Sequence, residues 1–179
     1  MLLVGCGGGD ASDEPTHHAG ALPATGLVAL EDKTSCALPD FKDALLQQIN
    51  AARASARTCG TVNMPAVGGL AWNDRLFSAA ARHSDDMARH NYFSHTGRDG
   101  RSPGQRVSAE GYSWRIAGEN IAAGQTSVHA VMTAWLASPG HCENLMRSAY
   151  TEVGVACVVA PSGSTYSRYW TMKLAQPGN

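Results

Sequence analysis

The sequence predicts an α+β domain, in which helices come before and between a small number of strands. Two observations support this prediction. Apolar residues recur at helical spacing in several segments between residues 40 and 146, and two segments near the end alternate or run apolar as strands do. Residues 161–164, with the sequence Pro-Ser-Gly-Ser, separate these two segments and are typical of a hairpin loop. Helices that precede and interrupt neighbouring strands favour the α+β class.

Length and composition predict one globular domain with a tail. The chain has 179 residues, of which 44% are hydrophobic and 16% are charged. The formal net charge is −1 and the basic residues are scattered, so we expect no nucleic-acid partner. We also expect a monomer.

The first residues predict export to the cell envelope. Leu3-Val4-Gly5-Cys6 is similar to a bacterial lipobox, in which the cysteine is lipidated. We therefore interpret residues 1–6 as the remnant of a lipoprotein signal; the alternative is a chance cysteine in a tail. Residues 7–35 have no periodic apolar face and are typical of a flexible linker. This predicts an extracytoplasmic domain at residues 36–179, either a lipoprotein of the outer membrane or periplasm, attached through Cys6, or a secreted protein.

Amphipathic spacing predicts three longer helices, at residues 40–57, 73–89 and 127–137. Asp40 stands at the N-cap position of the first helix. His83 falls on the apolar face of the second helix, where a buried, hydrogen-bonded histidine is favoured over a ligand. The remaining expected elements are short helices at residues 103–110 and from residue 139, loops at residues 60–69 and 91–100, and strands at residues 116–123, 152–160 and 166–174.

The cysteines predict disulfides. There are five, and setting Cys6 aside leaves an even number, which favours two bridges in an oxidising compartment. Spacing favours Cys36–Cys59 and Cys142–Cys157, although sequence alone allows three connectivities. The alternative for Cys142 is a reactive thiol beside His141.

Three short segments place ionisable residues among Gly, Pro, Ser and Asn, as loops and strand ends do. They are Phe93-Ser94-His95-Thr96-Gly97, Gly118-Glu119-Asn120-Ile121 and Ser138-Pro139-Gly140-His141. Histidine and glutamate brought together from separate segments can bind a metal, relay a proton or hold a polar ligand. The sequence therefore predicts one pocket formed by His95, Glu119 and His141.

These segments resemble the CAP superfamily, also known as the SCP or pathogenesis-related-1 family of cysteine-rich secretory proteins. The resemblance is closest to its short bacterial members and runs from about Asp40 to Gln176. Further matching segments are Leu45–Arg53, Leu70–Asn73, His83–Met87, Trp135–Ser138 and Thr151–Val155. Each segment is weak evidence alone, but their order and spacing are specific. The resemblance implies an α-β-α sandwich with a central antiparallel sheet.

The resemblance also implies a cleft lined by two histidines and two glutamates. His95, Glu119 and His141 match three of these four positions, and Ser138 stands where the family has the second glutamate. Asn120 is a further cleft candidate, or a residue that shapes the strand end. The first three residues are a reasonable ligand set for a weakly held Zn²⁺ or another divalent cation. The alternative is that Glu119 hydrogen-bonds both histidines and ties the loops together.

Three functions follow as hypotheses. The first is a binding module for a small apolar or envelope-derived ligand, with or without a divalent ion. The second is a metal-assisted hydrolase acting on peptide or envelope material, although the sequence has no G-x-S-x-G nucleophile elbow. The third is a structural or adhesion domain whose cleft is vestigial. We favour a non-enzymatic role. Trp114 is either a core residue or part of the cleft rim.

Overall fold

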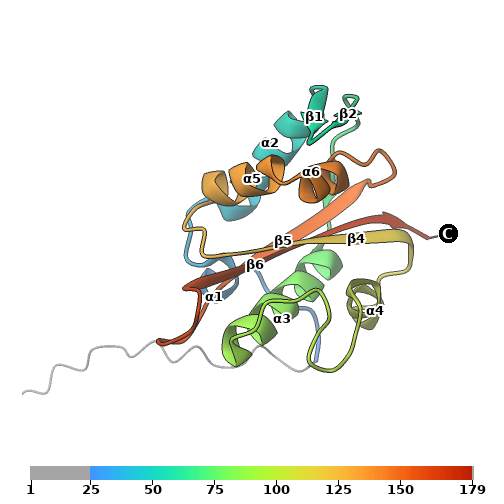
Figure 1. Cartoon of the computed structure of the whole chain (residues 1–179). Coiled ribbons are helices and arrows are strands. Elements are labelled where there is room, and N and C mark those ends of the chain that lie inside the picture. The colour runs from blue at the N-terminus through green and yellow to red at the C-terminus, as the bar shows by residue number, and fades with distance from the viewer. Residues whose placement is uncertain (1–24, 179) are drawn as a thin grey trace, which may run out of the picture.

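The computed structural model describes residues 25–178, and these form a three-layer α-β-α sandwich (Figure 1). The central sheet has the strand order β3-β5-β6-β4. Strand β3 pairs with β5 in parallel, and the other two pairings are antiparallel. The bounds are Ala71–Trp72 for β3, Trp114–Ala123 for β4, Glu152–Val159 for β5 and Arg168–Pro177 for β6. This confirms the predicted fold class.

Helices cover both faces of the sheet (Figure 1). One face carries α2 (Phe41–Arg53), α5 (Val128–Ala137) and α6 (Pro139–Leu145), and the other carries α3 (Asp74–His90) and α4 (Pro103–Ala109). The short helix α1 (Asp32–Ser35) contacts β5. Strands β1 (Arg57–Cys59) and β2 (Val62–Met64) form a separate antiparallel hairpin. No helix within residues 25–178 is long and apolar enough to cross a membrane.

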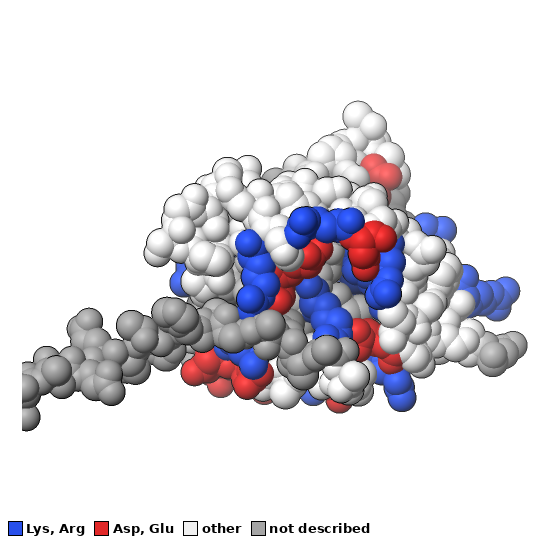
Figure 2. All heavy atoms as spheres, turned by 90° about the horizontal axis from the view of Figure 1, so that it is seen from below, with Lys and Arg blue, Asp and Glu red and all other residues white. Residues whose placement is uncertain are grey.

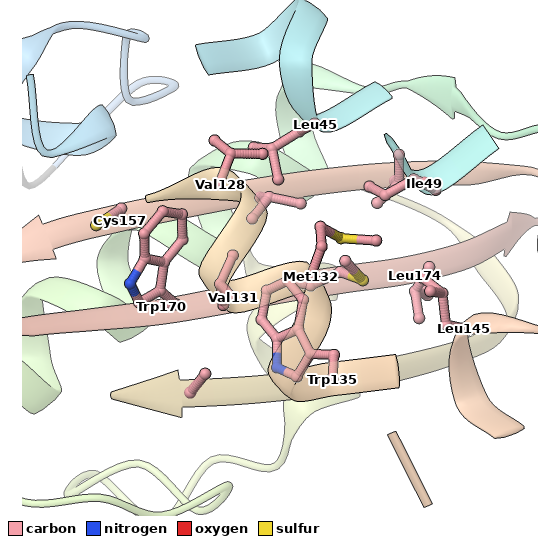
Figure 3. Packing of buried hydrophobic residues seen from close by; sticks show 14 of the residues in the cluster. Leu45, Ile49, Val128, Val131, Met132, Trp135, Leu145, Cys157, Trp170 and Leu174 are labelled. Atoms are coloured by element: carbon pink, nitrogen blue, oxygen red, sulfur yellow. The ribbon is translucent and has the colours of Figure 1, made fainter. Parts of the chain in front are cut away.

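The face covered by α2 and α5 holds the main apolar core (Figure 3). Side chains alternate along a strand, so every second residue of β6 points to this face. These residues include Trp170 and Leu174, which pack with Leu45 and Ile49 of α2 and with Trp135 of α5. The apolar stripes predicted for these two helices are therefore confirmed.

Helix α3 lies against the opposite face at very short range. A Cβ atom on Gly154 of β5 would lie 2.1 Å from the backbone nitrogen of Phe77. Only glycine leaves room for the helix backbone at this point. The helix begins where the Asn73 side chain accepts hydrogen bonds from the backbone N–H groups of Arg75 and Leu76, as a capping residue does. The predicted limits of this helix are accurate to one residue.

Three predicted elements differ clearly from the structure. The last strand, predicted at residues 166–174, lies at Arg168–Pro177. The first long helix ends at Arg53 rather than at residue 57, because Arg57 already belongs to β1. The expected loop at residues 60–69 contains β2, which pairs back onto β1. A tight hairpin of two three-residue strands is too short to leave an alternation signal in the sequence.

The predicted disulfide pairing is wrong. The bridges join Cys36 to Cys157 and Cys59 to Cys142, with Cα–Cα distances of 5.3 and 5.5 Å. The first bridge holds the end of α1 against β5, where Cys36 N–H also donates to the Cys157 carbonyl. Proximity along the chain suggested the wrong pairs, because the fold brings distant segments together. Cys142 is therefore not a free thiol.

The packed domain begins before residue 36. Val28 is buried against Phe77 and Ala81 of α3, and Thr34 and Ser35 of α1 are buried. The last part of the expected linker thus belongs to the domain. The predicted lipobox with Cys6, and the linker up to residue 24, lie outside the described residues.

Candidate functional site

Glu119 is the centre of a buried charged cluster on the α3 face of the sheet. Strand alternation turns its side chain toward α3 and α4, and that side chain is only 1% exposed. Its Oε1 accepts a hydrogen bond from His95 Nδ1 at 2.8 Å, and its Oε2 accepts one from Arg106 Nη2 at 2.8 Å. Lys173 lies opposite Glu119 in the β4–β6 register and donates its Nζ to the same Oε2. Both carboxylate oxygens are therefore engaged.

The cluster keeps Glu119 ionised. Burial alone would raise the pKa of this carboxyl, but the hydrogen bond from His95 and the charges of Lys173, His83 and Arg106 together hold the pKa well below its usual range. Burial lowers the pKa of Lys173 to about 8, with the charge of Glu119 opposing the shift. A carboxylate with a depressed pKa is a weak base, so Glu119 is poorly suited to take up a proton near pH 7.

His83 packs behind this cluster as a neutral residue. It is buried, and its Nε2 donates to the Ser94 carbonyl at 2.9 Å. The same Nε2 lies 3.9 Å from Glu119 Oε1. Burial lowers the pKa of His83 to about 4, with nearby Arg106 and Lys173 adding to the effect and Glu119 opposing it. The predicted buried, hydrogen-bonded histidine is confirmed.

A cavity of about 580 Å³ opens beside His95 and Glu119. The His95 side chain is 52% exposed, whereas the carboxylate behind it is buried. Trp114, which is 40% exposed, lines the cavity and donates its indole N–H to Ser108 Oγ at 2.9 Å. A Cβ atom on Gly104 would lie 2.8 Å from the Trp114 ring, so glycine lets the start of α4 approach it. The other lining residues are Ser102, Pro103, Gln105, Ala117 and Gly118.

His141, Ser138 and Asn120 are close to this site but do not line the cavity. Ser138 precedes α6, and its hydroxyl lies 2.9 Å from His141 Nδ1. Asn120 donates its side-chain N–H to the His141 carbonyl at 3.0 Å. Asn144 of α6 donates to both the Asn120 side chain and the Glu119 carbonyl, at 2.8 and 3.2 Å. These amides tie α6 to β4 and fix the position of His141.

The network thus links Glu119 to one histidine directly. His95 donates to its carboxylate, whereas His141 pairs with Ser138. Burial, together with the nearby charge of His95, lowers the pKa of His141, which favours its neutral form. His141 is thus electrostatically coupled to His95 without sharing Glu119.

Glu119 does not fit the role of a direct metal ligand in this arrangement. Two cationic side chains and one imidazole already donate to its oxygens. Within residues 25–178, no three His, Cys, Asp or Glu side chains lie together as a metal site. The Glu119 carboxylate orients the His95 ring by accepting a hydrogen bond from Nδ1. The Nε2 atom of His95 has no hydrogen-bond partner among the described residues.

Sequence reasoning missed Arg106 and Lys173. Lys173 stands between Met172 and Leu174 in a predicted strand, and a lysine flanked by large apolar residues in a strand is a signal of a buried partner. Arg106 left no comparable signal, because an arginine in a short helix is usually solvated. Its Nη2 donates to the His95 carbonyl at 2.7 Å as well as to Glu119, so it holds the loop that carries His95.

Comparison with known families agrees with this fold. The profile of the CAP family, the Cysteine-rich secretory protein family, matches residues 46–174. The chain belongs to the CAP family. The matched range contains His95, Glu119 and His141, together with β3, β4, β5 and most of β6.

Two CAP relatives come from Bacillus subtilis. The uncharacterized protein YkwD is 36% identical over 101 residues, which are 56% of this chain and 38% of YkwD. The uncharacterized membrane protein YlbC is 37% identical over 86 residues, which are 48% of this chain and 25% of YlbC. The matched region thus spans well under half of either relative.

Solved CAP structures share the fold. An extracellular protein containing an SCP domain from Bacillus anthracis is 27% identical, with a TM-score of 0.57 over 78% of this chain and 44% of that one. An outer surface protein of Borrelia burgdorferi has a TM-score of 0.60 at 19% identity, covering 78% of this chain and 96% of that one. The second likeness is one of fold alone.

Proposed function

We propose that this CAP domain is an extracytoplasmic binding module whose ligand site is the cavity beside His95 and Glu119. The observation that carries the proposal is the rigid wall of this cavity. Glu119 is fixed by His95, Arg106 and Lys173, so the polar wall is organised before any ligand arrives. The cavity, at about 580 Å³, is within the range of about 300–1,000 Å³ usual for small-molecule sites.

The lining favours a small ligand with both apolar and polar parts. Trp114 and Pro103 offer apolar surface, and Ser102, Gln105 and Ser108 offer hydrogen-bonding groups. A small apolar or envelope-derived molecule with a polar end matches this mixture. The depressed pKa of Glu119 argues against acid–base chemistry by this residue, which favours binding over hydrolysis.

The extracytoplasmic location is supported by the two disulfides and by the relatives. Disulfides persist in oxidising compartments. The Bacillus anthracis and Borrelia burgdorferi proteins are an extracellular and an outer surface protein. A lipid on Cys6 would attach the domain to a membrane through the segment that precedes residue 25. Mass spectrometry of the membrane-extracted protein, compared with a Cys6→Ala variant, tests this part of the proposal.

A divalent cation such as Zn²⁺ is part of the proposal only as a weakly held ligand. His95 would bind it through Nε2, with Glu119 fixing the ring from Nδ1, and His141 would offer a second imidazole. A bound cation of this kind would supply Lewis acidity at the cavity wall. With Glu119 engaged by Arg106 and Lys173, two imidazoles are fewer than the three protein ligands usual for a catalytic zinc.

The ligand proposal is tested by nuclear magnetic resonance of the labelled protein. Titration with lauric acid, a sterol and N-acetylglucosamine should shift the Trp114 indole N–H and the Gly104 and Gly118 amides for at least one probe. The Trp114→Ala variant should lose that saturable shift, and a Trp72→Phe variant, altered outside the cavity, should keep it. Unchanged cavity signals with every probe would support the vestigial cleft instead.

The metal is tested by calorimetric titration with Zn²⁺. We expect weak binding that His95→Ala abolishes and that His129→Ala, changed at an exposed histidine of α5, leaves intact. Equal binding by the two variants would remove the cation from the proposal. Micromolar or tighter binding, worth about −8 kcal/mol, would mean that further ligands join His95.

A hydrolase is the second candidate, and one observation favours it. The Ser138 hydroxyl lies 2.9 Å from His141 Nδ1, a distance suited to a nucleophile and its base. No carboxylate among the described residues hydrogen-bonds His141 as a triad acid does. Labelling with a fluorophosphonate decides the point: modification of Ser138 that is lost in His141→Ala would favour the hydrolase, and the binding proposal predicts none.

A further inference from the structure

A second cavity lies on the other side of Arg106. It has a volume of about 420 Å³ and shares no lining residue with the first cavity. Figure 2, which views the molecule from the side of α3 and α4, shows basic and acidic side chains gathered around a hollow. The lining is mostly charged and includes Arg82, His83, Asp86, Arg98, Arg101 and Arg106.

Two residues that line this cavity each have a buried polar atom without a hydrogen-bond partner among residues 25–178. The atoms are His83 Nδ1 and Arg106 Nε, and the two residues are 1% and 8% exposed. Buried polar atoms nearly always have a hydrogen-bond partner, so two unpaired atoms on residues that line one cavity need an explanation. Leaving each atom unsatisfied destabilises the folded protein.

One of the two unpaired atoms is a hydrogen-bond acceptor and the other is a donor. The Ser94 carbonyl can only accept, so the Nε2 that contacts it carries the proton of the neutral His83 ring. Nδ1 is then an acceptor that lacks a donor. Arg106 Nε is a donor that lacks an acceptor, because this guanidinium already uses Nη1 on the Arg101 carbonyl and Nη2 on the His95 carbonyl and Glu119. A complementary ligand must both donate and accept.

Arg98 adds an unneutralised charge at the same place. Two other arginines of the lining have carboxylate partners: Arg82 pairs with Glu110 at 2.6 Å, and Arg101 with Asp99 at 3.3 Å. The exposed Arg98 guanidinium forms no ion pair or hydrogen bond with any residue between 25 and 178. An anionic group in the cavity would complete the set, since Arg98 and Arg106 Nε can both donate to it.

We propose that this second cavity binds a small carboxylate that also carries an N–H or O–H donor next to it, as α-amino acids and α-hydroxy acids do. The carboxylate accepts from Arg106 Nε and the Arg98 guanidinium. The neighbouring donor fills the acceptor at His83 Nδ1. The mixed charges of the lining suit such a ligand better than a simple anion, because Asp86 lies in the same wall.

Matched probes test this assignment on the full chain. L-alanine, L-lactate and propionate are titrated while the His83 ring nitrogens are followed by long-range ¹H–¹⁵N spectra. We expect saturable binding of alanine or lactate with a shift at Nδ1, and binding of propionate at least ten-fold weaker, because propionate lacks the donor. No saturable binding by any probe, or equal affinity for propionate and lactate, would overturn the proposal.

Three variants separate the ligand's two contacts from general effects. Arg98→Ala removes an exposed side chain and should weaken alanine and lactate binding at least ten-fold. His83→Gln keeps a donor for the Ser94 carbonyl and lacks Nδ1, so it should abolish the preference over propionate. Arg115→Ala, at an exposed position on β4, should bind like the parent. Parent-like binding by Arg98→Ala would overturn the proposal even if the His83 variant does not fold.

Discussion

The two faces of the central sheet are built on different principles. On the α2 and α5 face, Trp135, Trp170 and their neighbours form an apolar core with the Cys36–Cys157 bridge at its edge. On the α3 face, β4 buries Glu119 and β6 buries Lys173. Neighbouring residues of β4 or β6 point to opposite faces of the sheet, so a step of one residue changes the environment of the side chain from apolar to charged. The α2 and α5 face holds the main apolar core, whereas the α3 face combines smaller apolar clusters with the buried charges that position His95 and border both cavities.

The largest loss of stability is expected from changes to the disulfide bridge at the edge of the apolar face. Replacing the first bridge by Cys36→Ala/Cys157→Ala should lower the free energy of unfolding by about 4–5 kcal/mol, because the bridge closes a loop of 121 residues. Urea denaturation measures this loss. Cys59→Ala/Cys142→Ala, with a separation of 83 residues, should cost nearly as much. A loss below 1 kcal/mol in both would mean that packing alone holds these segments.

The next effect is expected at the centre of the charged face. Glu119→Gln leaves Lys173 and Arg106 buried without their carboxylate, so the free energy of unfolding should fall by about 3 kcal/mol or more. Glu143→Gln, a partly exposed residue that forms no ion pair with any described residue, is the matched control and should change stability by less than about 0.5 kcal/mol. Equal stability of the two variants would refute a structural role for the cluster.

A smaller loss of stability is expected when the pH is lowered. The pKa of His83 is about 4 in the folded protein and near 6.5 when exposed, so between these values the unfolded chain binds the additional proton. Stability should therefore fall as the pH drops from 6.5 to 4, by about 2–3 kcal/mol for this group. His83→Gln should flatten this dependence in urea titrations at several pH values. His129→Gln, altered at an exposed position, should not.

The smallest effect is expected for a single methyl group of the apolar face. Ile49→Val should lower the free energy of unfolding by about 1 kcal/mol, because the site is fully buried and well packed. The same measurement on Glu119→Gln provides the comparison between the faces. A larger loss for Ile49→Val than for Glu119→Gln would reverse the order of the two.

Sequence predicted the apolar face better than the charged one. Periodicity identified α2, α3 and α5, because each buries one regular stripe, and the family resemblance supplied the layered architecture and brought His95 and Glu119 together. Periodicity cannot report which buried charges meet, so Arg106 and Lys173 were missed. It also cannot report which cysteines meet, because Cys36 and Cys157 come together only when α1 docks on β5.

The most direct test concerns the charge of Glu119, on which the positioning of His95 rests. The ¹³C chemical shift of its carboxyl is followed during acid titration of the folded protein and of the urea-unfolded chain, where the group titrates near pH 4.5. We expect the folded carboxyl to remain ionised well below that pH. A folded midpoint at or above 4.5 would contradict it, because Glu119 would then not be held by Lys173, Arg106 and His95.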